Sequence, residues 1–251
     1  MISVSSTSFS AQSIESVLEA ISKEFQHWEI FAEGEHYLPS VLHQFGAVAP
    51  SYDLKYSIHA PISDVNVAAM SERMREAATL ELMATMECAI QMEVDTLTVH
   101  PGYRPFVVKG MEDKALMRAA KSLRTLNRVS REFGVRIAVE NMPEFFMMLG
   151  KTAEELEALL EGTDLGVCFD IGHAHTTGQM DQMLALQDRF VNVHIHDNNG
   201  SHDEHLTIGE GQIDFESVLS RMKGYKGNYV IEIKTMESAI LSRDRLQKML
   251  D

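Results

Sequence analysis

The chain has 251 residues, 45% of them hydrophobic, with 22 basic and 37 acidic side chains and a formal net charge of −15. Because affinity for nucleic acid depends largely on Lys and Arg meeting phosphates, this balance argues against nucleic acid as the main partner, although one local basic patch remains compatible with it. The N-terminus lacks a signal-peptide pattern, and no run of eighteen apolar residues could span a bilayer. We therefore expect a cytoplasmic protein with no membrane partner, and leave its oligomeric state open.

Strand-like runs alternate with helical patterns along the whole chain. The eight runs rich in β-forming residues are 2–9, 27–32, 55–60, 95–100, 135–141, 165–170, 190–196 and 228–234. Between them, apolar residues recur at helical spacing, most clearly from Leu116 to Leu126. Ser10, Thr152 and Asp214 are the expected N-caps of the first, fifth and seventh helices.

Eight strand–helix units in this length predict an α/β protein with a single (β/α)₈ TIM barrel, forming one domain over residues 1–251. A doubly wound open sheet shares the alternation, but eight repeats place it second. Cys88 and Cys168 lie in apolar segments and are expected to be buried free thiols, because a disulfide framework needs more cysteines.

Ligand-capable side chains stand where the predicted strands end, which is where barrel enzymes build their sites. Glu33 and His36 follow the second strand, and His59, His100 and Glu140 end the third, fourth and fifth strands. Asp170 and His173 stand at the end of the sixth strand, and His194 and His196 at the end of the seventh. Asp203 and His205 lie in the loop after the seventh strand, and Glu232 lies in the eighth. Each alone has a simpler explanation, such as a helix cap or a structural hydrogen bond. Together they predict a metal site, because a ring of buried charges needs a compensating cation. Imidazole and carboxylate without thiolate favour a divalent metal, zinc first and Mn, Fe or Co as alternatives.

Seven short motifs then give the chain a family resemblance. They are HAP at 59–61, HPG at 100–102, EN at 140–141, DIGH at 170–173, HIHD at 194–197, DEH at 203–205 and GEGQIDF at 209–215. In this order they resemble the xylose-isomerase-like TIM barrels, which include endonuclease IV and the sugar isomerases and epimerases. The similarity extends from the third strand to the eighth.

The resemblance implies which residues hold metal. Endonuclease IV-type enzymes hold three zinc ions, and each of their nine ligands has a counterpart here. The first set is His59, His100 and Glu140; the second is Glu140, Asp170, His194 and Glu232; the third is His173, Asp203 and His205. The isomerase and epimerase branch uses only the second set, with one divalent metal, so one to three ions are expected.

Two departures weaken the likeness to endonuclease IV itself. The first strand reads ISVSSTSF in place of a GxHVS-like sequence, and the Arg- and aromatic-bearing loop that this nuclease inserts into the minor groove is missing. GEGQIDF also looks more like the isomerase branch. These departures affect the DNA-binding parts and leave the metal residues intact.

The favoured function is therefore metal-assisted proton transfer that isomerises or epimerises a small sugar or sugar phosphate, with Glu140 and Glu232 as catalytic residues. An endonuclease IV-like zinc phosphodiesterase acting on abasic-site DNA or another phosphoester is the alternative, and a non-catalytic sugar or metal binder is third. Expected substrate contacts are Glu144, His196, Gly209 and Gly211. The two glycines could let backbone N–H groups approach a phosphate, although taken alone they are better explained by a tight turn.

Overall fold

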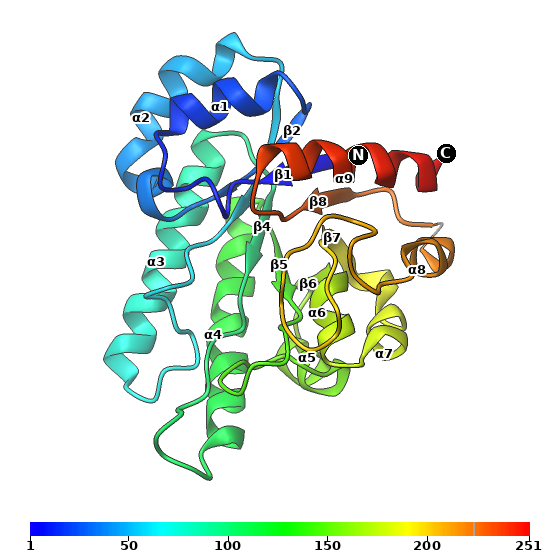
Figure 1. The fold of residues 1–251 in the computed structure, drawn as a ribbon. Helices are drawn as coiled ribbons and strands as arrows, with labels where there is room; N and C mark the ends of the chain where they lie inside the picture. Colours follow the sequence, from blue (N-terminus) through cyan, green and yellow to red (C-terminus); the bar gives the residue numbers. More distant parts are fainter. Residues whose placement is uncertain (223) are drawn as a thin grey trace.

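Eight parallel strands close into a barrel in chain order, with the first strand paired to the last. We describe a computed structural model, which covers residues 1–222 and 224–251. The strands are β1 (Ile2–Ser5), β2 (His27–Phe31), β3 (Lys55–His59), β4 (Thr96–Val99), β5 (Arg136–Glu140), β6 (Gly166–Asp170), β7 (Phe190–Ile195) and β8 (Asn228–Ile231). Figure 1 shows them at the centre of the molecule with the helices around them. The predicted (β/α)₈ barrel is confirmed.

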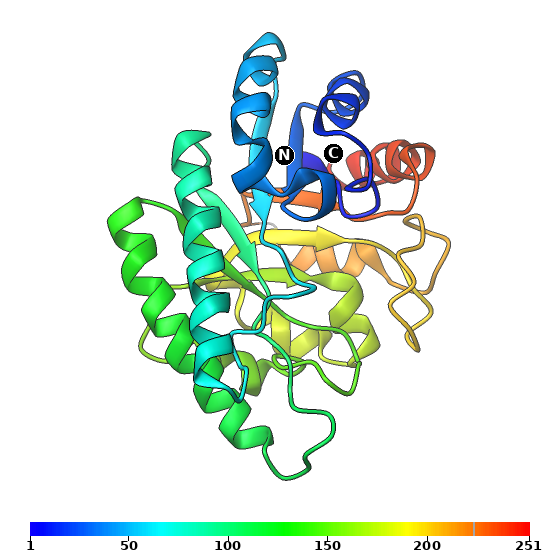
Figure 2. The ribbon, with the colours of Figure 1, turned by 90° about the vertical axis from the view of Figure 1, so that its left-hand side faces the viewer.

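Helices follow the strands and cover the outside of the barrel. They are α1 (Ile14–Ser22), α2 (Leu38–Val48), α3 (Glu72–Gln91), α4 (Glu112–Phe133), α5 (Ala153–Leu160), α6 (Ile171–Thr176), α7 (Met180–Leu184), α8 (Phe215–Arg221) and α9 (Met236–Leu250), with short 3₁₀ turns at Gly34–His36, Ala49–Ser51 and Gln187–Arg189. Figure 2 shows the two longest, α3 and α4, lying side by side. Among the described residues, no helix is long and apolar enough to cross a membrane.

Local sequence explains where most helices begin. Thr152 and Asp214 cap α5 and α8 as expected, each side chain accepting a hydrogen bond from a backbone N–H in the first turn. The expected cap of the first helix was wrong by three residues, because Ser13 caps α1. The chain leaves β1 at Ser5 and turns through residues 6–12, so the first strand is also shorter than predicted.

The strands alternate between an apolar outer face and a polar inner face. Outward side chains such as Trp28, Leu97 and Phe169 are fully buried in the apolar core under the helices. Inward side chains hydrogen-bond across the barrel, as Asn192 on β7 does with Thr98 on β4. Barrel interiors are usually filled by Val, Ile and Leu, so this polar interior already suggests a functional role. Both cysteines are buried and free, as expected.

Candidate metal centre

Glu140, the last residue of β5, lies at the middle of a group of histidines. Its Oε2 atom is 3.2 Å from His59 Nε2 and 3.0 Å from His100 Nε2. Its Oε1 atom is 3.2 Å from His194 Nδ1 and 3.5 Å from His173 Nδ1. Burial would raise the pKa of Glu140, but the histidines around it, His194 first, hold that pKa well below its ordinary value. Each oxygen of this carboxylate therefore faces a different set of potential metal-binding groups.

A second group forms around His194 on β7, whose side chain is fully buried. Besides Glu140, its Nδ1 atom lies 3.6 Å from Glu232 Oε1 and 3.9 Å from Asp170 Oδ2. Asp170 Oδ2 is buried and has no hydrogen-bond partner among the described residues. A buried carboxylate oxygen without a partner is costly, and a cation among these four side chains would remove that cost.

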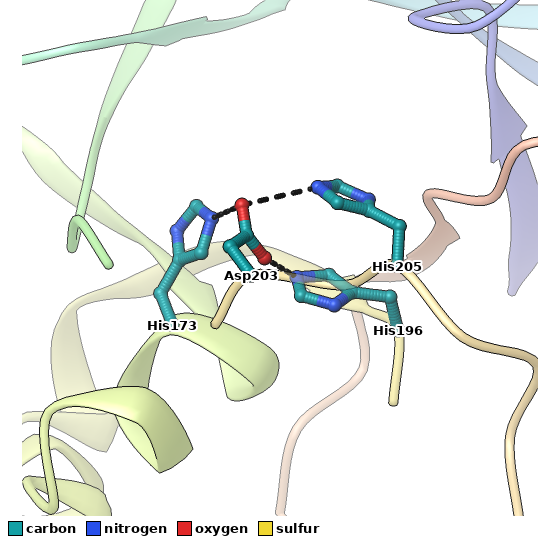
Figure 3. Close-up of side chains that lie close together, drawn as sticks. All are labelled: His173, His196, Asp203 and His205. Carbon is teal, nitrogen blue, oxygen red and sulfur yellow. Dashed lines mark hydrogen bonds and ion pairs between the residues drawn. The ribbon is translucent and has the colours of Figure 1, made fainter. Parts of the chain in front are cut away.

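A third group lies at the loop after β7 and is drawn in Figure 3. Asp203 Oδ2 is 3.3 Å from His173 Nε2 and 3.2 Å from His205 Nε2. His196 approaches the other oxygen, with its Nε2 atom 3.3 Å from Asp203 Oδ1 and equally far from Asp170 Oδ1. Its ring stacks on that of His205 with centroids 4.0 Å apart. All four residues offer ligand atoms within 4.8 Å of one another. His173, Asp203 and His205 are the three that the family resemblance predicts as ligands, and His196, through its contact with Asp170, also links the second and third groups.

Backbone carbonyls orient three of these histidines. The accepting oxygens are those of Ala60 for His59, Asn141 for His173 and Glu232 for His205, at 2.8, 2.8 and 2.9 Å from the Nδ1 atoms. Since a carbonyl can only accept, each Nδ1 carries a proton, and the neutral form of each ring has its lone pair on Nε2, where it can bind a metal. His205 also has a left-handed backbone, with φ of 50°; such conformations in non-glycine residues are concentrated at functional sites.

The third group is strongly charged in the absence of a metal. Burial opposes protonation of His173, but Asp170 and Asp203 raise its pKa to about 10. Burial likewise opposes protonation of His205, and its contact with Asp203 raises its pKa to about 9. These shifts describe histidines that are held as cations by carboxylates, and a dication could replace those protons.

The donor set fits a divalent metal. It consists of imidazole nitrogens and carboxylate oxygens, which suit zinc and its first-row neighbours. The structure brings all nine predicted metal residues into the three adjoining groups. In one such set, His59, Glu140 and His194 have ligand atoms that all lie within 4.8 Å of one another.

The predicted phosphate-binding role of Gly209 and Gly211 needs correction. Their backbone N–H groups donate to Asp197 Oδ2 at 2.8 and 2.9 Å, and those of Asn198 and Ile213 donate to Oδ1. Asp197 is fully buried, so a carboxylate of the chain itself already occupies the place of an anion. Gly211 is required there, because a Cβ atom would overlap Asp197 and the Asn198 backbone.

Other predicted positions fall outside the three groups. Glu144 binds Lys151 Nζ at 2.8 Å, with its side chain 55% exposed. Glu33 accepts hydrogen bonds from the backbone of Ile62 and Ser63, and so caps a loop. His36 is buried against Ser6.

Sequence reasoning missed Glu29, which belongs to the centre. It lies within β2, is fully buried, and places Oε1 2.7 Å from His194 Nε2. A signal was present, because an acidic residue between Trp28 and Ile30 in a strand of a closed barrel must point into the polar interior.

The fold and this arrangement define a class, the (β/α)₈ barrels whose strand ends carry side-chain groups that could hold a metal. A family model described as xylose isomerase-like TIM barrel matches residues 18–250. The chain belongs to this family.

The relatives similar to this chain include an uncharacterized protein, an epimerase-like protein and a probable endonuclease. An uncharacterized protein of Methanocaldococcus jannaschii, MJ1311, is 36% identical over 259 residues, covering 99% of this chain and 88% of the relative. A solved structure described as a D-tagatose 3-epimerase-like protein is 35% identical with a TM-score of 0.92, over 99% of this chain and 96% of the other. A probable endonuclease 4 of Acholeplasma laidlawii is 29% identical over 181 residues, covering 64% of this chain and 60% of the relative.

Proposed function

We propose that the protein is a divalent-metal-dependent enzyme that isomerises or epimerises a small sugar or sugar phosphate. The observation that carries this proposal is the position of two carboxylates, Glu140 and Glu232, on the same nitrogen of His194, at 3.2 and 3.6 Å. The full-length similarity to a D-tagatose 3-epimerase-like protein supports it.

The chemistry requires groups that move a proton beside a carbonyl. A metal bound by Glu140, Asp170, His194 and Glu232 would act as a Lewis acid on the sugar oxygens. Glu140 and Glu232 would remove the proton from one face of the carbon and return it from the other. Because both carboxylates are at most 5% exposed, water competes little with the substrate for them.

A second function is favoured by one specific observation. Glu140 Oε2 faces the Nε2 atoms of His59 and His100, Oε1 faces Nδ1 of His194, and the group of His173, Asp203 and His205 is fully assembled. These residues would hold more than one divalent ion, which would supply the water activation and leaving-group stabilisation of a multinuclear zinc phosphodiesterase. A single-metal isomerase has no chemical need for the third group.

Metal content together with two assays separates these functions. The purified protein is loaded with Zn²⁺ or Mn²⁺, its metal per chain is measured, and it is assayed for epimerisation of ketohexoses and for cleavage of an activated phosphodiester. One metal per chain with epimerisation supports the first function. Three metals with phosphodiester cleavage replace it by the second.

His205→Ala sharpens this test, with the exposed neighbour His202→Ala as its matched control. In a single-metal isomerase, His205→Ala keeps its metal and loses only part of its activity. In a three-metal hydrolase the same variant releases about one metal per chain, because a ligand has been removed. His202→Ala should resemble the wild type in both cases.

A further inference from the structure

Glu29 lies inside the barrel, on the side of His194 that faces away from the other carboxylates. Its side chain is fully buried, and Oε1 lies 2.7 Å from His194 Nε2. Its other oxygen accepts hydrogen bonds from Asn192 Nδ2 at 2.6 Å and Ser57 Oγ at 3.0 Å. Within the part of the chain that the structure describes, Oε1 forms no hydrogen bond, and the 2.7 Å ion-pair contact places His194 Nε2 within reach of it as a donor. One oxygen is thus fixed by the barrel and the other is directed at the histidine.

The ring of His194 is turned the opposite way from its neighbours. Its Nδ1 atom faces Glu140 and Glu232, while Nε2 faces Glu29. His59, His173 and His205 instead present Nε2 to the centre and bind a backbone carbonyl through Nδ1. In His194, the ring nitrogen that points away from the centre therefore contacts a carboxylate, whereas in the other three histidines that nitrogen contacts a backbone carbonyl.

The layer of side chains around Glu29 leaves little freedom for another arrangement. The two amide hydrogens of Asn192 are used by Glu29 and by Thr98 Oγ1, the latter at 3.0 Å. Asn192 Nδ2 also lies 3.3 Å from His194 Nε2, but it has no hydrogen left to donate to that nitrogen. A buried carboxylate costs several kcal/mol unless it is paired, so the interior position of Glu29 calls for a compensating partner, and His194 is the one within reach of Oε1 among the described residues.

We propose that Glu29 is a positioning residue, which accepts the Nε2–H of His194 and thereby presents the Nδ1 lone pair to a metal. A carboxylate holding the outer nitrogen of a histidine fixes both its tautomer and its ring orientation, and strengthens it as a ligand. The inference rests on the proposed metal centre, and it is the same for either reaction.

Metal affinity provides the first test. Co²⁺ is titrated into metal-free wild type, Glu29→Gln, Glu29→Asp and the control Thr98→Ser, which alters the same layer but keeps the hydroxyl that accepts from Asn192. Glu29→Gln should bind about 10- to 100-fold more weakly, as expected when a histidine ligand loses its carboxylate partner. Glu29→Asp keeps the charge at a greater distance and should fall between Gln and wild type. Thr98→Ser should bind like wild type.

The exchangeable ring proton of His194 provides a readout that simple packing would not change. In Co²⁺-loaded wild type it should give a shifted, slowly exchanging Nε2–H resonance, and in Glu29→Gln this resonance should move and exchange faster. Unchanged affinity and resonance in Glu29→Gln would overturn the proposal, as would a wild-type spectrum in which His194 carries its proton on Nδ1. The wild-type spectrum decides the matter even if Glu29→Gln does not fold. Wild type that binds no Co²⁺ at all would instead contradict the metal centre itself.

Discussion

Glu140 is the residue on which the account depends most. It is 1% exposed and lies within 3.5 Å of four histidines. Glu140→Gln keeps the size of the side chain and removes its charge, so it should weaken metal binding and remove a proton-transfer group. General acid–base assistance is worth about 10²- to 10⁴-fold, and turnover should fall by at least that range. Steady-state assays of metal-loaded protein measure it, with Glu157→Gln at an exposed position of α5 as control. Normal turnover with full metal content in Glu140→Gln would show that the site is wrongly placed.

The histidines of the third group should make the metal-free protein sensitive to alkaline pH. The pKa values of about 10 for His173 and about 9 for His205 lie above the ordinary value of 6.5. Protonation therefore stabilises the folded state fully below about pH 6.5, and this contribution is lost as pH rises through 9 and then 10. Urea unfolding of metal-free protein should give a lower free energy of unfolding at pH 10 than at pH 7. His205→Ala should show a smaller decrease; an equal decrease would mean that His205 is not the titrating group.

At the residue scale, sequence predicted the residue types and strand ends of the centre but not its interior partner. The nine proposed ligands follow a simple rule, because parallel strands of a barrel end at one face. Glu29 lies two residues before the end of its strand, and only the barrel's closure brings it to His194. The environment of Gly209 and Gly211 could not be predicted either, because the sequence around them does not show that their backbone N–H groups donate to Asp197.

Among the elements, the loop between β7 and α8 is organised by one buried carboxylate. Asp197 accepts four backbone N–H groups, whereas Asp214 accepts one as the exposed cap of α8. Each buried group left without a partner costs about 1–3 kcal/mol, so Asp197→Ala should lower the free energy of unfolding by several kcal/mol. Asp214→Ala should cost only about 1 kcal/mol. Chemical denaturation compares them, and an equal, small effect of both would contradict this view of the loop.

The periodic elements were more predictable than their boundaries. All eight strands lie within the predicted runs, because alternation of apolar and polar residues matches a sheet that is packed outside and polar inside. The start of α1 was missed because Ser10 and Ser13 are both good caps, and the turn after β1 decides between them. The path of this turn depends on tertiary contacts, which the local sequence does not reveal.

For the whole molecule, net charge should govern which partners it meets. With a charge of −15, its field opposes long-range attraction to a polyanion. Electrophoretic mobility shift with an abasic-site duplex should show no tight complex at physiological salt. Submicromolar binding that weakens as salt is raised would contradict this expectation and favour the phosphodiesterase.

The central claim is that the polar face of the barrel holds a divalent metal. Elemental analysis of purified wild type and Glu140→Gln, after loading with Zn²⁺ and removal of free ions, tests it most directly. The account predicts at least one equivalent in wild type and a loss of metal in the variant, because Glu140 borders both the first and second groups. A wild-type protein without bound metal, or a variant that retains all of it, would contradict the account.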